Sequence, residues 1–351
     1  MLQNPGNEGT SIRLAILDDY QDVAIHSAEQ DWADLRRALR PENAHLVIQV
    51  FKDPIPTEDL VTVLRPFEVI CTMRERTPFT AELFEALPNL KLLTTTGPVN
   101  RSIDIEAAKK RGITVAGTGA TGNSTVEHIW GLLLSVARNI PAYDRGVKDP
   151  TGPWQSLSGV SSRELPTGLM GKTIGLVGFG RLGSAVAKIA DAFGMNVVAW
   201  SQNLTVDKIS PEQQEYVQIV SKRELFETSD FISIHLVLSP RSHGIIGFGD
   251  LQLMKRSAII INTSRGPIID EEALLRVLRE GGIRGAGIDV FDKEPLSEDS
   301  PWRQLGDRVV LTPHVGYVET RNYQKFWEDT VWNVDTWLDG KNEYVHELTG
   351  L

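Results

Sequence analysis

The chain has 351 residues, 41% of them apolar, and a formal net charge of -10. Its length fits about two domains of roughly 150 residues, and its acidic balance without clusters of Lys or Arg disfavours a nucleic-acid partner. No apolar run approaches the roughly 18 residues of a membrane span, and the polar residues 1–10 lack the apolar core of a signal peptide. We therefore expect a cytoplasmic protein that binds neither membranes nor nucleic acid.

The first third of the chain alternates short β-rich runs with helical stretches, which is typical of parallel α/β sheets. Helices are predicted at residues 80–86, capped by Thr80, and at 104–110. Strands are predicted at residues 14–17, 46–51, 69–72, 90–95 and 114–116. The single cysteine, Cys71, lies in one of these strands and is predicted to be a buried thiol without a disulfide partner.

A helix at residues 124–139, which ends ahead of Pro141, is apolar nearly all round. Such a helix belongs between domains or subunits, and we expect a homodimer. Residues 149–171 are rich in Gly, Pro and Ser, carry Trp154, and are predicted to be a linker loop.

A second series of strands and helices follows this linker. A helix is predicted at residues 271–280, capped by Asp270 and ended by two glycines. The predicted strands are residues 173–177, 196–200, 231–234, 258–262, 285–288 and 309–311. A last helix, residues 323–339, carries three Trp residues whose spacing does not keep to one helical face, so we expect them to pack against more than one neighbour. If this helix returns to cap the first domain, that domain is discontinuous.

A glycine-rich loop, Gly178-Phe179-Gly180-Arg181-Leu182-Gly183, follows the strand at 173–177 and precedes a helical stretch at 184–192. In this context the glycines allow a tight turn and close approach of the backbone to a pyrophosphate, while the helix N-terminus offers unpaired N–H groups. The sequence therefore predicts a dinucleotide site and an α/β fold of two doubly wound, parallel-sheet (Rossmann-like) domains. Residues 121–318 would bind the dinucleotide, and residues 1–120 with 319–351 would form the substrate domain.

The residue expected to hold the adenosine ribose is unusual. Such loops are followed about 20 residues later by Asp or Glu at the end of the next strand, but this chain has Ser201 there. A serine does not repel a 2′-phosphate. The nearest cations are Lys208 and Arg181, so the cofactor is NADP(H) or NAD(H), with a leaning to tolerance of NADP(H).

Three polar residues each follow a predicted strand: Arg265, Glu294 and His314. A guanidinium can bind a carboxylate with two parallel hydrogen bonds, an imidazole can move a proton near neutral pH, and a carboxylate can orient that imidazole. Because ligands gather at the carboxyl ends of strands in open α/β sheets, the three are predicted to form one site. With the nucleotide loop, they indicate hydride transfer at the carbon beside a carboxylate.

The chain resembles the D-isomer-specific 2-hydroxyacid dehydrogenases over nearly its whole length. The motifs that carry the resemblance are Asn89-Leu90-Lys91-Leu92, Val126-Glu127-His128, Gly171-Lys172-Thr173-Ile174-Gly175, the glycine loop, Ser233-Ile234-His235-Leu236, Asn262-Thr263-Ser264-Arg265-Gly266, Gly285-Ala286-Gly287-Ile288-Asp289-Val290-Phe291 and Thr312-Pro313-His314. The resemblance implies reduction of a small 2-keto acid, like glyoxylate or hydroxypyruvate, to the D-2-hydroxy acid by NAD(P)H.

The same resemblance implies roles for single residues. Arg265 would bind the substrate carboxylate, His314 would donate the proton, and Glu294 would hydrogen-bond His314. Asp289 would meet the nicotinamide carboxamide. Further cofactor contacts are expected from Gly178, Gly180, Arg181, Leu182, Gly183, Ser201, His235, Thr263, Ser264, Arg265, His314 and Gly316, and substrate contacts from Met73, Arg74, Thr96, Gly97 and Arg265.

Other histidines and other functions compete with this interpretation. His235 is expected beside the cofactor, and His128, inside an apolar helix, is expected to pack. No His or Cys pairs recur at metal-ligand spacing, so no metal is expected. The alternatives are a dinucleotide-sensing corepressor of the same fold, disfavoured by the absence of basic clusters or long disordered extensions, and a formate or phosphite dehydrogenase on the same scaffold.

Overall fold

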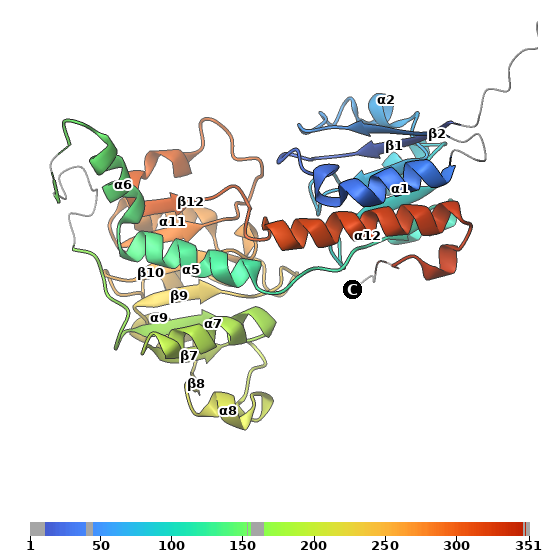
Figure 1. The fold of residues 1–351 in the computed structure, drawn as a ribbon. Coiled ribbons are helices and arrows are strands. Elements are labelled where there is room, and N and C mark those ends of the chain that lie inside the picture. The colour runs from blue at the N-terminus through green and yellow to red at the C-terminus, as the bar shows by residue number, and fades with distance from the viewer. Residues whose placement is uncertain (1–10, 40–44, 153, 156–164, 347, 349–351) are drawn as a thin grey trace, which may run out of the picture. The chain divides into compact units, whose positions relative to one another are not determined.

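The computed structural model describes residues 11–39, 45–152, 154–155, 165–346 and 348. The chain divides into two compact units, Met1–Gly122 with Val318–Leu351, and Asn123–Tyr317. Each contains a parallel sheet with helices on its faces (Figure 1), which confirms the predicted α/β fold class. Most of the predicted linker, at 153 and 156–164, lies outside the described residues.

The unit formed by Met1–Gly122 and Val318–Leu351 contains a five-stranded sheet among its described residues, with strand order β2-β1-β3-β4-β5. All of its strand pairs are parallel. The strands are β1 (Ser11–Ile16), β2 (His45–Val50), β3 (Val69–Thr72), β4 (Leu92–Thr95) and β5 (Thr114–Ala116). The helices are α1 (Glu29–Leu39), α2 (Leu60–Leu64), α3 (Ala81–Ala86), α4 (Ile105–Lys110) and α12 (Thr320–Leu338).

Helix α12 joins this unit from the far end of the sequence and packs against α1 and β4. Its buried face is partly polar, and these side chains bind the segment after β5. Asn333 donates to the Gly117 carbonyl at 2.8 Å, and Asp329 accepts from the Gly119 N–H at 2.8 Å. The Trp residues of α12 have different surroundings, because Trp327 is buried whereas Trp332 is 43% exposed and stacks on the ring of His346.

The unit Asn123–Tyr317 contains a seven-stranded sheet among its described residues, with order β12-β11-β10-β9-β6-β7-β8 and only parallel pairs. The strands are β6 (Thr173–Val177), β7 (Asn196–Trp200), β8 (Val217–Ile219), β9 (Phe231–Ile234), β10 (Ile259–Asn262), β11 (Gly285–Ile288) and β12 (Val309–Leu311). The helices are α5 (Ser124–Ala137), α6 (Ile140–Lys148), α7 (Arg181–Ala192), α8 (Pro211–Gln214), α9 (Lys222–Thr228), α10 (Phe248–Leu251) and α11 (Glu271–Arg279).

Both faces of this sheet are buried, which explains the continuous apolar strands. In β10, Ile259 and Ile261 belong to the core beneath α5 and α7, whereas Ile260 belongs to the core beneath α9, α10 and α11. Successive side chains of a strand point to opposite faces, so a strand covered on both sides has no polar alternation. The two cores thus fix the register of the strands, and the loops of the site extend from the ends of these strands.

The structure corrects several predicted elements. Helix α5 ends at Ala137, two residues earlier than predicted, and Asn139 takes a left-handed φ of 55° before α6 begins. Pro141 does not end a helix but lies in the first turn of α6, where its missing N–H costs no helical hydrogen bond. Helix α7 begins at Arg181, inside the glycine loop, and the edge strand β8 was not predicted.

No helix in the described part of the chain has both the length and the apolar character that crossing a bilayer requires.

Cys71 is 1% exposed in β3, and burial raises the pKa of its thiol to about 12. The thiolate is the reactive form of cysteine, so the thiol of the native protein should not react with Ellman's reagent at about pH 8. In concentrated guanidinium chloride the same reagent should report one thiol per chain. Rapid labelling of the native protein would contradict the burial of Cys71.

Candidate active site

The three residues predicted to act together lie on loops that follow neighbouring strands. Arg265 follows β10, Glu294 follows β11 and His314 follows β12. These strands are adjacent and parallel, so their carboxyl ends meet at one edge of the sheet. Ligands of open α/β sheets bind at this edge.

His314 and Glu294 are in direct contact. The Nδ1 atom of His314 lies 2.7 Å from Oε2 of Glu294. The other carboxylate oxygen, Oε1, accepts a hydrogen bond of 3.0 Å from the Phe291 N–H. Because the carboxylate is itself anchored to the backbone, it orients the imidazole ring and assigns a hydrogen to Nδ1. Both side chains remain about one quarter exposed, at 21% and 24%.

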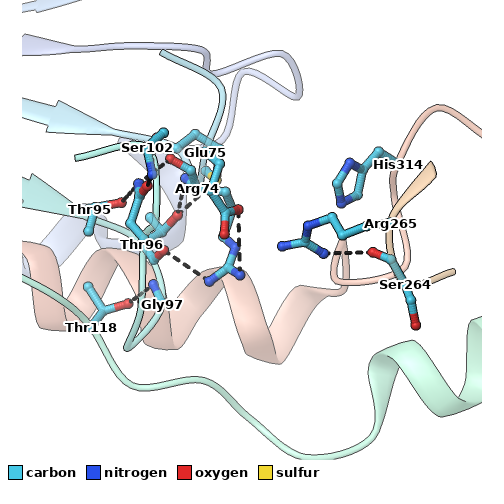
Figure 2. A network of polar contacts seen from close by, with 12 residues as sticks. Arg74, Glu75, Thr95, Thr96, Gly97, Ser102, Thr118, Ser264, Arg265 and His314 are labelled. Carbon is cyan, nitrogen blue, oxygen red and sulfur yellow. Dashed lines mark hydrogen bonds and ion pairs between the residues drawn. The ribbon is translucent and has the colours of Figure 1, made fainter. Parts of the chain in front are cut away.

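Arg265 extends from a short loop that its own polar groups hold together. The Asn262 side chain donates to the Arg265 carbonyl at 3.0 Å, and the Ser264 hydroxyl donates to the Ile234 carbonyl at 2.8 Å. The Arg265 guanidinium donates to the Ser264 carbonyl at 2.7 Å, as Figure 2 shows. A β-carbon at Gly266 would lie 2.2 Å from the Phe291 carbonyl carbon, so only glycine allows this loop to pack against the loop that carries Glu294.

The backbone around His314 is held by Asp289, which is 1% exposed. One carboxylate oxygen of Asp289 accepts from the Val315 N–H and the other from the Gly316 N–H, both at 2.9 Å. Burial raises the pKa of Asp289, but hydrogen bonds from His128, Thr312 and Val315 outweigh it and hold the pKa below its ordinary value. The Asp289 carboxylate is thus anionic and committed to the protein, and the expected contact with a nicotinamide stays a prediction.

Sequence reasoning missed His128. It was expected only to pack, but its Nε2 lies 2.9 Å from the Thr312 hydroxyl and 3.2 Å from Asp289 Oδ1. The reason is that α5 crosses beneath the ends of β11 and β12, so its first turns reach the loop that carries His314. The available signal was the Glu-His pair within Val126-Glu127-His128, one of the motifs that resemble the family.

The glycine loop has the shape that a dinucleotide requires. Gly178 has a φ of 101°, and a β-carbon there would lie 2.8 Å from the backbone of His235. A β-carbon at Gly183 would lie 2.4 Å from the Gly178 carbonyl oxygen, whereas one at Gly180 would meet no described atom within 4 Å. The first and third glycines therefore allow close packing, and the middle one leaves room for a phosphate beside the first turn of α7, where Arg181 is exposed and Leu182 half-buried.

His235 lies under this loop, where its backbone packs against Gly178. Burial lowers its pKa to about 4, so the ring is neutral near pH 7. Neither of its ring nitrogens has a hydrogen-bond partner among the described residues. The contact expected between His235 and the cofactor stays a prediction.

Ser201 follows β7 directly beside the glycine loop, since the Gly178 N–H donates to the Trp200 carbonyl at 2.8 Å. The loop after Ser201 folds back on itself, and Lys208 Nζ donates to the Asn203 carbonyl at 2.5 Å. The ribose end of the predicted site thus has a cation in the same loop as Ser201. Thr263, the remaining predicted cofactor contact, is half-buried directly after β10.

The predicted substrate residues of the other unit lie at the carboxyl ends of β3 and β4. Arg74 has a left-handed φ of 51°, and its guanidinium donates to the Thr96 carbonyl at 3.2 Å and lies 3.8 Å from Glu75 (Figure 2). The same guanidinium packs against Gly97, leaving no space for a β-carbon there. Met73 is buried beneath the loop, and its sulfur accepts from the Thr96 hydroxyl. Met73 as a whole is thus covered by its neighbours, and its predicted contact with the substrate stays a prediction.

Comparison with known proteins identifies the family of the chain. Residues 130–316 match the family model described as "D-isomer specific 2-hydroxyacid dehydrogenase, NAD binding domain". A glyoxylate reductase of Korarchaeum cryptofilum is 36% identical over 82% of this chain and 85% of its own, and a hydroxypyruvate reductase of Thermotoga maritima is 37% identical over 77% and 84%. The crystal structure of a phosphoglycerate oxidoreductase from Vibrio cholerae superposes with a TM-score of 0.83, at 32% identity over 94% of this chain and 99% of that one.

The nucleotide loop after β6, the charged residues after β10, β11 and β12, and these matches lead to one conclusion. The chain belongs to the D-isomer specific 2-hydroxyacid dehydrogenase family and is an NAD(P)-dependent oxidoreductase.

Proposed function

We propose that the enzyme reduces a small 2-keto acid, of the glyoxylate or hydroxypyruvate kind, to the D-2-hydroxy acid, with His314 as the proton donor. The observation that carries the proposal is the 2.7 Å contact between His314 Nδ1 and Glu294 Oε2. Since Nδ1 donates to the carboxylate, proton transfer to the substrate falls to Nε2. Relatives named glyoxylate reductase and hydroxypyruvate reductase support the substrate class.

A reduced nicotinamide dinucleotide supplies the hydride when bound, and Gly178 to Gly183 would hold its phosphates. In the reduction, His314 gives its Nε2 proton to the carbonyl oxygen as that oxygen gains negative charge. Glu294 stabilises the positive charge that the ring carries before this transfer. Arg265 binds the substrate carboxylate and thereby orients the neighbouring carbonyl.

The surroundings of Arg74 favour a substrate with a small, uncharged tail. Its guanidinium already donates to the Thr96 carbonyl and lies near the Glu75 carboxylate, which partly neutralises it. A second carboxylate or a phosphate on the substrate would meet a guanidinium whose charge Glu75 already offsets in part. We therefore favour glyoxylate or hydroxypyruvate over a phosphorylated keto acid.

Replacing His314 with Ala should lower kcat for keto-acid reduction by at least about two orders of magnitude, because general acid catalysis contributes about 10²–10⁴-fold. Binding of the reduced dinucleotide, followed by its fluorescence, should persist, since the phosphate loop is untouched. A variant with nearly full turnover would show that another group donates the proton.

Replacing Arg265 with Lys should raise KM for the keto acid and also lower kcat, because an ammonium keeps the charge but cannot form two parallel hydrogen bonds to a carboxylate. The matched control is Arg279→Lys at the exposed end of α11, which should leave both parameters unchanged. Steady-state kinetics with glyoxylate and hydroxypyruvate measure both. If the two variants behave alike, the substrate carboxylate binds elsewhere.

We also propose that the enzyme accepts NADP(H) as well as NAD(H). The support is the absence of a carboxylate at Ser201, together with the Lys208 ammonium that is bonded to the carbonyl of Asn203 in the same loop. A 2′-phosphate would meet a hydroxyl and a cation there, and not the carboxylate that selects NAD(H).

Replacing Ser201 with Asp should lower the ratio of kcat/KM for NADPH over NADH roughly five- to hundredfold. A new negative charge beside a 2′-phosphate costs about 1–3 kcal/mol at an effective dielectric near 20 over several ångströms. Ser201→Asn is the control, because it matches Asp in shape without the charge and should move the ratio little. An unchanged ratio in Ser201→Asp would remove Ser201 from the ribose site.

The predicted homodimer finds support in α6. This helix has no buried residue, and its apolar side chains Ile140 and Val147 are 50% and 66% exposed. Trp154, just beyond it, is 80% exposed. Apolar groups so placed favour association with another surface, and a second copy of the chain remains our proposed partner.

A further inference from the structure

His128, Thr312 and Asp289 form a chain of polar contacts behind the loop that carries His314. All three residues belong to the unit Asn123–Tyr317. His128 comes from α5, Asp289 follows β11, and Thr312 follows β12. The His128 side chain is 22% exposed, so it is largely shielded from water.

The direction of the hydrogen bonds in this chain can be assigned. An ionised carboxylate accepts only, so Asp289 accepts from the Thr312 hydroxyl, whose oxygen lies 2.5 Å away. That bond uses the one hydrogen of the hydroxyl, and therefore the contact of 2.9 Å between Thr312 and His128 must be donated by His128 Nε2. The same Nε2–H also points toward Asp289 Oδ1 at 3.2 Å.

The far end of the chain of contacts is the backbone of the next two residues after His314. Asp289 accepts from the N–H groups of Val315 and Gly316. His314 itself has a left-handed φ of 56°, a conformation that costs free energy for a residue with a β-carbon and persists only where the surroundings hold it. The Asp289 carboxylate stabilises this conformation through the two N–H groups. The Thr312 hydroxyl and the His128 ring in turn fix the position of the carboxylate.

We infer that His128 is a positioning residue for the reduction: its Nε2–H fixes the Thr312–Asp289 pair, which holds the strained turn that presents His314 to Glu294. The inference rests on the proposed function, in which His314 moves the proton. What it requires at position 128 is a hydrogen-bond donor at the distance of Nε2. A packing role would require only the volume of the ring.

Two substitutions separate these roles because they predict opposite orders of activity. His128→Gln keeps an N–H donor at a similar reach, whereas His128→Phe fills the space without a donor. The positioning role predicts that His128→Gln retains most of kcat. It predicts that His128→Phe lowers kcat about ten- to hundredfold, since a small misplacement of a catalytic group lowers the rate by up to about 10²-fold. If His128→Phe keeps the kcat of the unmodified enzyme and His128→Gln has a lowered kcat, His128 only packs and the inference is overturned.

Thr312→Val tests the middle of this chain of polar contacts, because valine keeps the shape of threonine and removes the hydroxyl. It should lower kcat as His128→Phe does, and the double variant should be little worse than either single one, since both remove the same interaction. Fully additive losses would contradict a shared chain of polar contacts. If His128→Phe does not fold, the variants His128→Gln and Thr312→Val still test the inference. It requires that His128→Gln be active and that Thr312→Val have a lowered kcat.

A second measurement needs no substrate. Hydrogen–deuterium exchange of the segment 312–317 should be faster in His128→Phe and Thr312→Val than in the unmodified protein, because the amides of Val315 and Gly316 lose their fixed acceptor. His128→Gln should exchange like the unmodified protein, and so should His26→Gln, a change at an exposed histidine of the other unit.

The two measurements keep the inference separate from the proposed function. Suppose that the unmodified enzyme reduces no 2-keto acid, while hydrogen–deuterium exchange of residues 312–317 is faster in His128→Phe and unchanged in His128→Gln. The substrate assignment then fails, and the positioning of the His314 turn stands. If the enzyme is active but neither exchange nor kcat distinguishes Phe from Gln, the inference about His128 fails and the proposed function stands.

Discussion

Parallel pairing of every strand in the sheet of Asn123–Tyr317 is the constraint on which the site depends. Parallel neighbours must be joined by crossovers, so all carboxyl ends collect at one edge and their loops meet there. The register is fixed because both faces are buried, and a slip of one residue would exchange the side chains of two separate cores. Residues as far apart in the sequence as Gly178 and His314 are thereby brought to the same edge.

A rigid edge still requires loops with defined shapes, and here buried polar side chains provide them. Asn262 and Asp289 bond to backbone groups of the loops that carry Arg265 and His314, and the half-buried Ser264 donates to the Ile234 carbonyl at the end of β9. A buried polar group without a partner costs free energy, so these side chains favour the one loop conformation that satisfies them. The loops that carry Arg265 and His314 are thus positioned by the same hydrogen bonds that stabilise them.

The parts of the fold that the sequence predicts correctly are those with local signals. Apolar β-branched runs identify the strands of both sheets, and the glycine loop identifies the start of the second series. Pro141 was misleading because the same residue marks the end of one helix or the first turn of the next. The edge strand β8 was missed because its three residues, Val217–Ile219, give almost no periodic signal.

The site was predictable to the extent that each residue lies in the loop that follows a strand. Arg265, Glu294 and His314 meet that description. His128 does not, because its role depends on contacts with Asp289 and Thr312 that are far away in the sequence and arise only when α5 packs beneath β11 and β12. Supporting groups of this kind carry no motif of their own, and the resemblance to a family marks the position without giving its reason.

The strand order also separates the choice of cofactor from the chemistry. Ser201 follows β7 and His314 follows β12, five inter-strand steps apart in the sheet, each about 4.8 Å. At the resulting separation of roughly 24 Å the interaction of two unit charges is below about 1 kcal/mol at an effective dielectric near 20, and salt screens it further. A charge introduced at the ribose end therefore hardly alters the protonation of the His314–Glu294 pair. In the function we propose, an elongated dinucleotide along this edge is selected near Ser201, and its selection there leaves the proton transfer by His314 unaffected.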